Sequence, residues 1–523
     1  MGQAMRPRQR KEPSVSDTTE QPRVKFGNSL PTTKATLGGL TGIGWGMLLG
    51  GVLVMVVCLV VGWWLVGLLA LFAGLLGNVF FIIRWGDLVA GRTLAARILD
   101  RYVDKKRGRE GTDLYETGLF SALPDDALLA LPGMLADLEE ITGTDGEGEE
   151  YVLLHHRKTS RNPLLAATFS CRPDGTDLLP QPQIDQQVSK FGGWIASLSG
   201  DTSIEGAVVV VDSALESIEP LIAKIDAEVS PHAPAAAQRQ LREGARALSG
   251  VYSDVEVFAS VVWNVNKLAT NTDDAVANIA AKLPGHRDRL AMAGAGSPVV
   301  ATSSDLARAV RIAYRPDRAR EFASDDLADR VSTLRITQAG PDFFDDSARR
   351  VCYHDGVASM TAMMVAPPQM HITEQILNDL FRPNGKFLRK RGAVYYRPMT
   401  QGKAFRTAQK IAEDASRNGT TVTGRRDVMA QRRGVLADKT LGDLQQGASM
   451  TAFAIQVTVT FPATEQGYRE AETELKNLLE GAGDMTYRFV DTDTAAAFHS
   501  TLPLGVLPWA YATALQQVTD RTQ

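Results

Sequence analysis

The chain has 523 residues, a formal net charge of −4 and three cysteines. Its length allows several domains, and the slightly negative charge excludes a protein that wraps nucleic acid through an overall positive charge. The cysteines, Cys58, Cys171 and Cys352, are odd in number and match no zinc-binding spacing, which excludes a disulfide framework and a CxxC site.

Residues 1–34 are polar, carry mixed charge and contain no sustained apolar period. A segment of this composition cannot bury enough apolar surface to offset the entropy of ordering. We therefore expect a disordered cytoplasmic tail.

Residues 35–86 are dominated by an uncharged run, since Asp, Glu, Lys and Arg are absent from residues 35–83. As one α-helix this run would be roughly 74 Å long, whereas the hydrocarbon core of a bilayer is about 30 Å thick. The pattern predicts a transmembrane helical hairpin over about residues 42–61 and 65–84, with its turn at residues 62–64. Because tryptophan favours the membrane–water interface, the expected interface anchors are Trp45, Trp63, Trp64 and Trp85.

Small residues recur at a spacing of four within this hairpin. That spacing lets helix backbones approach closely in lipid, although glycine is also common in membrane helices without a packing role. The residues that we expect to pack, within the hairpin or against a partner, are Gly42, Gly46, Gly50, Ala70 and Gly74.

Lys and Arg are frequent on both sides of the hairpin. Such flanks remain in the cytoplasm, so the expected location is the cytoplasmic (inner) membrane, with two spans and both termini inside. Membrane lipid is an expected partner, and the basic cluster at residues 105–109 would lie against anionic headgroups.

The remaining chain alternates between strand-like and helix-like periods. We expect a juxtamembrane helix and connector over 87–149, a first α+β cytoplasmic domain over 150–315 and a second over 316–523. The order strand–strand–helix–strand–helix–strand in the first domain is that of a ferredoxin-like layer, and a similar order recurs in the second. The predicted fold class is thus a membrane-anchored α+β protein with two ferredoxin-like layers. Whether they arose by duplication stays open.

Motifs that would indicate an enzyme are absent from the sequence. The chain has no Walker A loop, GxSxG elbow, HExxH or GxGxxG. The adjacent pair His155-His156 falls on a strand, where neighbouring side chains point to opposite faces and cannot share a metal ion. The acidic loop at 142–149 resembles a calcium loop only loosely and is better explained as a solvated turn. We therefore expect a protein that is not an enzyme and has no catalytic residue, cofactor or metal.

A basic run in the second half is the candidate surface for docking a partner. It comprises Lys386, Arg389, Lys390, Arg391, Arg397, Lys403 and Arg406. A solvated face, an acidic protein partner and DNA are the three alternatives, and sparse interleaved aromatic residues argue against specific nucleic-acid binding.

Several stretches resemble families of type IV secretion systems. The hairpin is similar to the small PrgI-type membrane proteins. Four further stretches resemble actinobacterial PrgI-like integral membrane proteins, which are encoded with conjugative DNA-transfer machinery. These stretches are Leu153-Leu154-His155-His156, Phe169-Ser170-Cys171-Arg172-Pro173-Asp174-Gly175, Gln183-Ile184-Asp185 and Gly192-Gly193-Trp194-Ile195-Ala196-Ser197-Leu198. The stretch near the end of the chain resembles the end of the amino-terminal domain of VirB-type secretion ATPases. It reads Ala497-Phe498-His499-Ser500-Thr501-Leu502-Pro503-Leu504-Gly505. The resemblance implies a platform without a motor and carries over no active-site residue.

The leading hypothesis is a non-enzymatic inner-membrane scaffold of a conjugative type IV secretion machine. It would dock a separate secretion ATPase and other channel subunits, as a homo-oligomer within a larger complex. The alternatives are a membrane component of a type VII secretion complex and a membrane-tethered enzyme with an unrecognised site.

Overall fold

The computed structural model describes most of the chain. The described residues are 42–81, 94–117, 130–160, 162–173, 175, 179–215, 219–230, 232–247, 253–327, 334–368, 373–418, 428–483 and 485–512. The predicted tail over residues 1–34 lies outside them.

Two antiparallel helices begin the described chain, α1 (Gly42–Val60) and α2 (Trp64–Phe81). The turn between them depends on Gly62, whose φ is +85°. The amide of Trp63 donates to the carbonyl oxygen of Cys58 at 2.7 Å, which closes α1 with a glycine-dependent helix cap. The predicted turn position therefore coincides with a backbone conformation that glycine adopts without strain.

The predicted transmembrane hairpin is wrong. Among the residues that the structure describes, no helix combines the length and apolar character that a bilayer crossing needs. The turn divides the described part of the uncharged run into helices of 19 and 18 residues. The predicted location in the cytoplasmic membrane, with two spans and both termini inside, is wrong for the same reason.

All strands of the described residues belong to one 13-stranded antiparallel sheet rather than to two separate ferredoxin-like layers, so the predicted fold class is also wrong in this respect. The strands are β1 (Leu114–Glu116), β2 (Leu138–Thr144), β3 (Glu150–His156), β4 (Leu164–Cys171), β5 (Ile204–Leu215), β6 (Ser253–Asn264), β7 (Val299–Val300), β8 (Phe343–Asp345), β9 (Cys352–His354), β10 (Val357–Ala366), β11 (Arg389–Pro398), β12 (Thr451–Pro462) and β13 (Thr486–Phe489). Their spatial order is β1-β8-β9-β10-β12-β11-β5-β6-β4-β3-β2, with β13 beside β10 and β7 beside β4.

Helices connect and cover these strands. They are α3 (Leu94–Glu110), α4 (Gln181–Gly200), α5 (Glu219–Glu228), α6 (Ala235–Ala247), α7 (Val265–Leu268), α8 (Thr272–Ala280), α9 (Leu283–Met292), α10 (Ser303–Tyr314), α11 (Arg318–Leu327), α12 (Asn378–Phe381), α13 (Gln401–Asn418), α14 (Val428–Gln445), α15 (Glu465–Gly481), α16 (Thr494–Ser500) and α17 (Pro508–Tyr511), with short 3₁₀ turns η3 (Gly133–Leu135) and η4 (Ile336–Gln338).

The second half of the sheet repeats the topology of the first. The pairing β2-β3-β4-β6-β5, with β7 on β4, matches the pairing β8-β9-β10-β12-β11, with β13 on β10. A pair of helices is inserted at the same point in each half, α5–α6 between β5 and β6 and α13–α14 between β11 and β12. This order identifies a structural repeat, which the sequence patterns left open.

Equivalent hydrogen bonds mark corresponding positions in the two halves. Thr168 on β4 bonds Ser260 on β6 through the side-chain oxygens at 2.8 Å, and Thr361 on β10 bonds Thr458 on β12 at 2.8 Å. The carbonyl oxygen of Thr168 accepts from the amide of Ala301 at 2.8 Å, and that of Thr361 accepts from the amide of Val490 at 2.9 Å. The repeat therefore extends to individual contacts.

The two halves join where β5 pairs antiparallel with β11. The register runs from Lys390 opposite Ser213 to Tyr396 opposite Ala207. If each half were a separate layer, these long strands would be exposed edges with unpaired backbone groups. Pairing them satisfies those groups and makes the sheet continuous, which is the physical reason that separate layers do not form.

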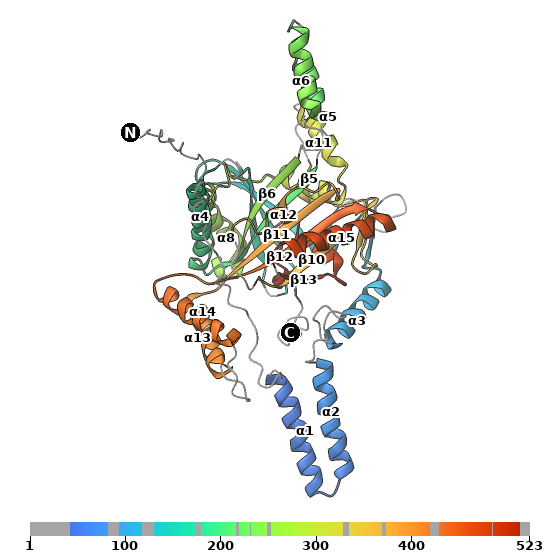
Figure 1. Ribbon diagram of the computed structural model, residues 1–523, viewed down its shortest axis with the longest axis vertical. Helices are drawn as coiled ribbons and strands as arrows, with labels where there is room; N and C mark the ends of the chain where they lie inside the picture. The colour runs from blue at the N-terminus through green and yellow to red at the C-terminus, as the bar shows by residue number, and fades with distance from the viewer. Residues whose placement is uncertain are drawn as a thin grey trace, which may run out of the picture.

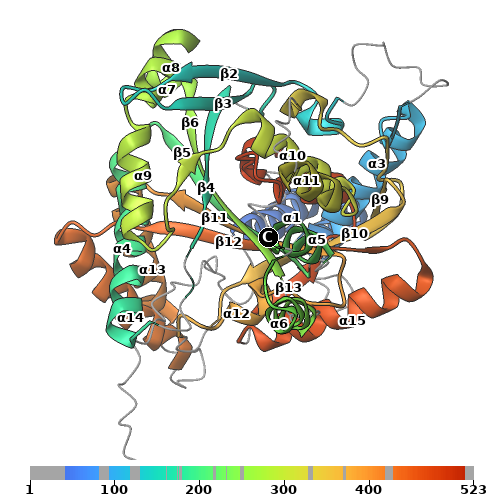
Figure 2. The same ribbon diagram turned by 90° about the horizontal axis from the view of Figure 1, so that it is seen from above.

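Helices project from the body at opposite ends. In Figure 1, α5 and α6 extend from one end of the sheet, whereas the α1–α2 hairpin extends from the other, with α13–α14 and α3 on that same side. Viewed from above, α13–α14 and α3 lie on either side of α1 (Figure 2). We refer to α5–α6 as the distal arm and to α13–α14 as the proximal arm.

Candidate functional site

A group of hydrogen-bonded ionisable and aromatic side chains lies inside the molecule, where the C-terminal segment meets both halves of the sheet. Tyr314 ends α10 and His499 lies in α16; the Tyr314 hydroxyl and His499 Nε2 are hydrogen-bonded at 2.9 Å. His354 on β9 donates from Nδ1 to the carbonyl oxygen of Tyr314 at 2.5 Å, and its Nε2 accepts from Ser359 Oγ at 2.8 Å. Residues far apart in sequence are thereby linked in one buried network.

Aromatic packing surrounds this network. The ring of Phe498 lies 4.8 Å from that of His354 and 5.2 Å from that of Tyr314, and Phe344 stacks on His499 at 5.2 Å. The Arg391 guanidinium lies over the Phe498 ring at 4.6 Å. Contacts of this kind favour a cation over a ring face, so Phe498 partly replaces the water that Arg391 loses by burial.

Arg391 and its neighbours on β11 are buried, because this strand is central in the sheet. Arg389, Lys390 and Arg391 are 2%, 1% and 1% exposed. Arg389 Nε donates to Asp212 Oδ1 on β5 at 2.7 Å, and Lys390 Nζ donates to the carbonyl oxygen of Asp379 at 3.2 Å. Burial lowers the pKa of Lys390 to about 8 and lowers that of Arg391.

The histidines of the network are neutral near neutral pH. Burial lowers the pKa of His354 to about 3 and that of His499 to about 3, and neighbouring Arg391 acts in the same direction on both. A ring with so low a pKa holds no proton to donate as a general acid near pH 7. Both rings instead position Tyr314 and the C-terminal segment through hydrogen bonds.

The adjacent pair His155 and His156 diverges, as the strand geometry predicts. His156 Nε2 donates to the carbonyl oxygen of Leu504 at 2.9 Å, and its Nδ1 accepts from the Tyr511 hydroxyl at 2.6 Å. His155 turns the other way, with Nδ1 3.5 Å from Glu139 Oε2. Burial lowers the pKa of His156 to about 4. His156 therefore fastens the C-terminal segment to β3.

Within the described part of the chain, no group of three or more His, Cys, Asp or Glu side chains is arranged to hold a metal ion. In the acidic loop at 142–149, Asp145 Oδ1 accepts hydrogen bonds from the amides of Glu147 and Glu149 at 2.9 and 3.0 Å. Through these two hydrogen bonds the Asp145 carboxylate stabilises the turn between β2 and β3.

The predicted docking residues separate into two groups. Arg389, Lys390 and Arg391 lie inside the sheet, so they cannot form a surface for a partner in this conformation. Lys386, Lys403 and Arg406 are exposed, and Arg397 is half-buried with its guanidinium 5.3 Å from the Trp509 ring. These basic residues are close together in sequence, but the structure does not place them on one face.

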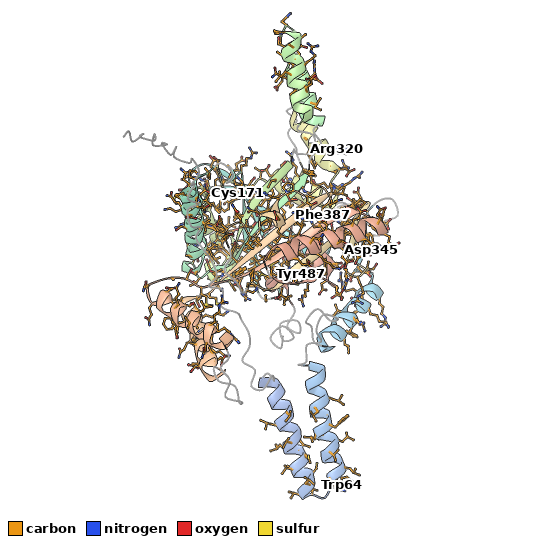
Figure 3. All side chains as sticks on the ribbon, in the orientation of Figure 1. Trp64, Cys171, Arg320, Asp345, Phe387 and Tyr487 are labelled. Atoms are coloured by element: carbon orange, nitrogen blue, oxygen red, sulfur yellow. The ribbon has the colours of Figure 1, made fainter. Side chains whose placement is uncertain are left out.

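The hairpin residues also differ in their surroundings. Trp63 and Trp64 are exposed at the turn, and Trp64 lies at the tip farthest from the body (Figure 3). Trp85, the side chain of Trp45 and the surroundings of Gly42 lie outside the described part of the structure. Side-chain space is open around Gly46 and Gly50, so neither contacts the rest of the hairpin closely, and their packing against a partner stays a prediction.

The seam between α1 and α2 instead uses two other glycines. A Cβ on Gly51 would lie 3.2 Å from the carbonyl oxygen of Ala70, and one on Gly67 would lie 3.1 Å from the Cα of Met55. Ala70 and Gly74 are half-buried on the face of α2 that contains Gly67. Sequence spacing identified the α2 face, whereas on α1 it selected a stripe that faces outward.

Sequence reasoning missed the structural role of residues 497–505. Phe498, Leu502 and Leu504 are fully buried in a core that also contains Ala166 and Val262 of the first half and Phe344 of the second. The sequence did carry a signal for burial, because most residues of this segment are apolar.

No protein-family model matches this chain, and none of the curated proteins is significantly similar to it. The resemblance to secretion proteins therefore stays a prediction.

Proposed function

We propose that this chain is a non-enzymatic scaffold of a conjugative type IV secretion machine, and that it docks a separate secretion ATPase. The observation that carries the proposal is the placement of helical arms at opposite ends of one continuous sheet (Figure 1). A scaffold must hold two partners at a fixed separation, and a sheet whose halves share hydrogen bonds and buried side chains is a rigid spacer for that purpose.

The segment that resembles the ATPase family supports the same proposal. Residues 497–505 connect both halves through Tyr314, His354 and the core around Phe498. Their side chains are used in packing and in hydrogen bonds that hold the body together. Partner binding would therefore fall to the projecting arms.

The distal arm is the candidate for docking the ATPase. It extends away from the body on the side opposite the α1–α2 hairpin, and an ion pair between Arg242 Nε and Asp226 Oδ1 at 2.5 Å links α6 to α5. Leu241 is 54% exposed on α6 beside this pair.

The experiment is affinity capture of the full-length chain from its native cells, with mass spectrometry of the proteins recovered. A matched pair of variants tests the arms. Leu215 pairs with Ser253 at the base of the distal arm, and Pro398 pairs with Thr451 at the base of the proximal arm. Each arm can therefore be replaced by an Asn-Gly turn that closes the β-hairpin directly.

We expect wild type and the variant without the proximal arm to recover a secretion ATPase, and the variant without the distal arm to lose it. Equal recovery by both variants would contradict a docking role for the distal arm. Recovery of type VII components, or of no companion by the wild type, would overturn the proposed function.

A further inference from the structure

The proximal arm carries a stripe of cations on its outer face. Lys403, Arg406 and Lys410 follow one another at i, i+3 and i+7 on α13, a spacing that places them on one side of a helix, and all three are exposed. No ion pair to any of them is found among the described residues. Arg406 Nε donates to the carbonyl oxygen of Gly402 within the helix at 3.1 Å.

The equivalent arm of the other half carries cations at the same spacing in sequence, Arg239, Arg242 and Arg246 on α6. In the distal arm, Arg242 is paired with Asp226 inside the arm itself. The two arms occupy corresponding places in the repeat, and what distinguishes the stripe of α13 is that it lies at the same end of the body as the hairpin (Figure 1). Three cations held together on one face repel one another unless negative charge lies nearby.

A second basic helix lies on the same side of the body. Helix α3, which follows the hairpin in the chain, carries four exposed cations: Arg101, Lys105, Lys106 and Arg109. Of these, Lys106 lies 3.7 Å from Glu110. Both views place α13 and α3 on either side of the α1–α2 hairpin (Figures 1 and 2).

The hairpin between these basic helices is apolar and exposed. Leu53 and Leu69 are 68% and 72% exposed, and α1 and α2 contain no charged residue. An apolar projection flanked by cations matches a bilayer surface, which offers anionic headgroups next to hydrocarbon. An acidic protein would match the cations but not the apolar surface between them.

We infer that the cationic stripe of α13, together with the basic face of α3, binds the surface of a bilayer that contains anionic phospholipid. The inference is independent of the ATPase partner, because it concerns the opposite end of the molecule. It concerns contact with the bilayer surface, with the apolar hairpin side chains against the hydrocarbon boundary.

The test is flotation of the full-length protein with vesicles. One set contains phosphatidylcholine alone, and the other contains equal amounts of phosphatidylcholine and phosphatidylglycerol. The variant carries Lys403→Gln, Arg406→Gln and Lys410→Gln. Its matched control removes three exposed cations from other helices, through Arg239→Gln, Arg289→Gln and Arg320→Gln; α6 and α11, which carry Arg239 and Arg320, lie at the distal end (Figure 1).

We expect the α13 variant to lose at least about tenfold in affinity for the anionic vesicles, since each cation near such a surface contributes on the order of a fivefold change. Its affinity for phosphatidylcholine should not change, and the control should behave as wild type. Added salt should weaken the wild type more than the α13 variant. Circular dichroism of both variants checks that each is folded.

Two outcomes would overturn the inference. The first is equal binding of anionic vesicles by wild type and the α13 variant. The second is a loss of protein companions in affinity capture while vesicle binding is unchanged, which would assign the stripe to an acidic protein.

Discussion

Arg389 on β11 donates a hydrogen bond from Nε to Asp212 Oδ1 on β5 at 2.7 Å, and both side chains are almost wholly buried. This contact crosses the strand pair that joins the two halves of the sheet. Arg391, two residues along β11, is also influenced by the charge of Asp212. Asp212 therefore acts on both buried guanidinium groups at the join, and Glu256 Oε2 lies 3.7 Å from Arg389 Nη2 as a second carboxylate.

Replacing Asp212 with Ala should destabilise the protein strongly. The change leaves Arg389 and Arg391 buried without their shared carboxylate, and breaking a buried pair in this way costs about 3–5 kcal/mol. The free energy of unfolding from urea denaturation measures the effect. Glu205→Ala is the control, because its ion pair with Lys267 at 3.3 Å is on the surface and should contribute less than about 1 kcal/mol. Equal losses would contradict the role of Asp212.

Stability should fall as the pH drops below about 6.5. Burial lowers the pKa of His354 to about 3, so the unfolded chain binds a proton at a pH where the folded protein does not. The stabilisation is full above the unfolded pKa and is lost as the pH falls toward 3. Near pH 5 the loss is about 2 kcal/mol for each such ring.

The variant His354→Asn should have a smaller decrease in stability between pH 7.5 and pH 5 than the wild type, measured as the urea midpoint. His232 is exposed, and His232→Asn should retain the wild-type dependence. A pH dependence unchanged by His354→Asn would show that this ring is not responsible.

Gly505 should not tolerate a side chain. Its φ is +68°, and a Cβ would lie 2.5 Å from the Cβ of Ala166. Gly447 has a φ of +92° but open space around it, so Gly447→Ala isolates the backbone strain of about 1–2 kcal/mol. Gly505→Ala should cost about 1–3 kcal/mol more because of overpacking. Thermal unfolding of the two variants compares them, and similar losses would mean that the core at Gly505 accommodates a methyl group.

Substitution of Gly67 should separate the helices of the α1–α2 hairpin. A side chain there would meet the backbone of Met55 on α1, whereas the space around Gly50 is open. Gly67→Leu should therefore accelerate amide hydrogen exchange in α1 and α2, and Gly50→Leu should leave it unchanged. Faster exchange in both variants would contradict the seam that the structure shows.

Local patterns in the sequence predicted individual elements well. The sequence of residues 452–461 has the composition of a strand, and β12 spans Thr451–Pro462. Asp-Gly is a turn signal, and Asp355 and Gly356 have φ values of +38° and +86° between β9 and β10. These features depend on residues close together in sequence, where periodicity and turn chemistry are informative.

The join between the halves could not be predicted in this way. Arg389 and Asp212 are 177 residues apart, and no local pattern states that two strands so distant will pair. The basic run on β11 was interpreted as a surface because charged runs are usually solvated. Its burial depends on Asp212 and Phe498, which the fold alone brings to it. The uncharged hairpin run was also misleading, because no described helix has the length and apolar character that a bilayer crossing needs.

Native-state hydrogen exchange, followed by mass spectrometry across a urea series, tests the continuous sheet most directly. If β5 and β11 join the halves into one rigid body, strands β4 and β6 of the first half and β10 and β12 of the second should lose protection at the same urea concentration. Loss of protection in one half while the other remains protected would contradict a single continuous sheet, and with it the rigid spacer on which the proposed scaffold depends.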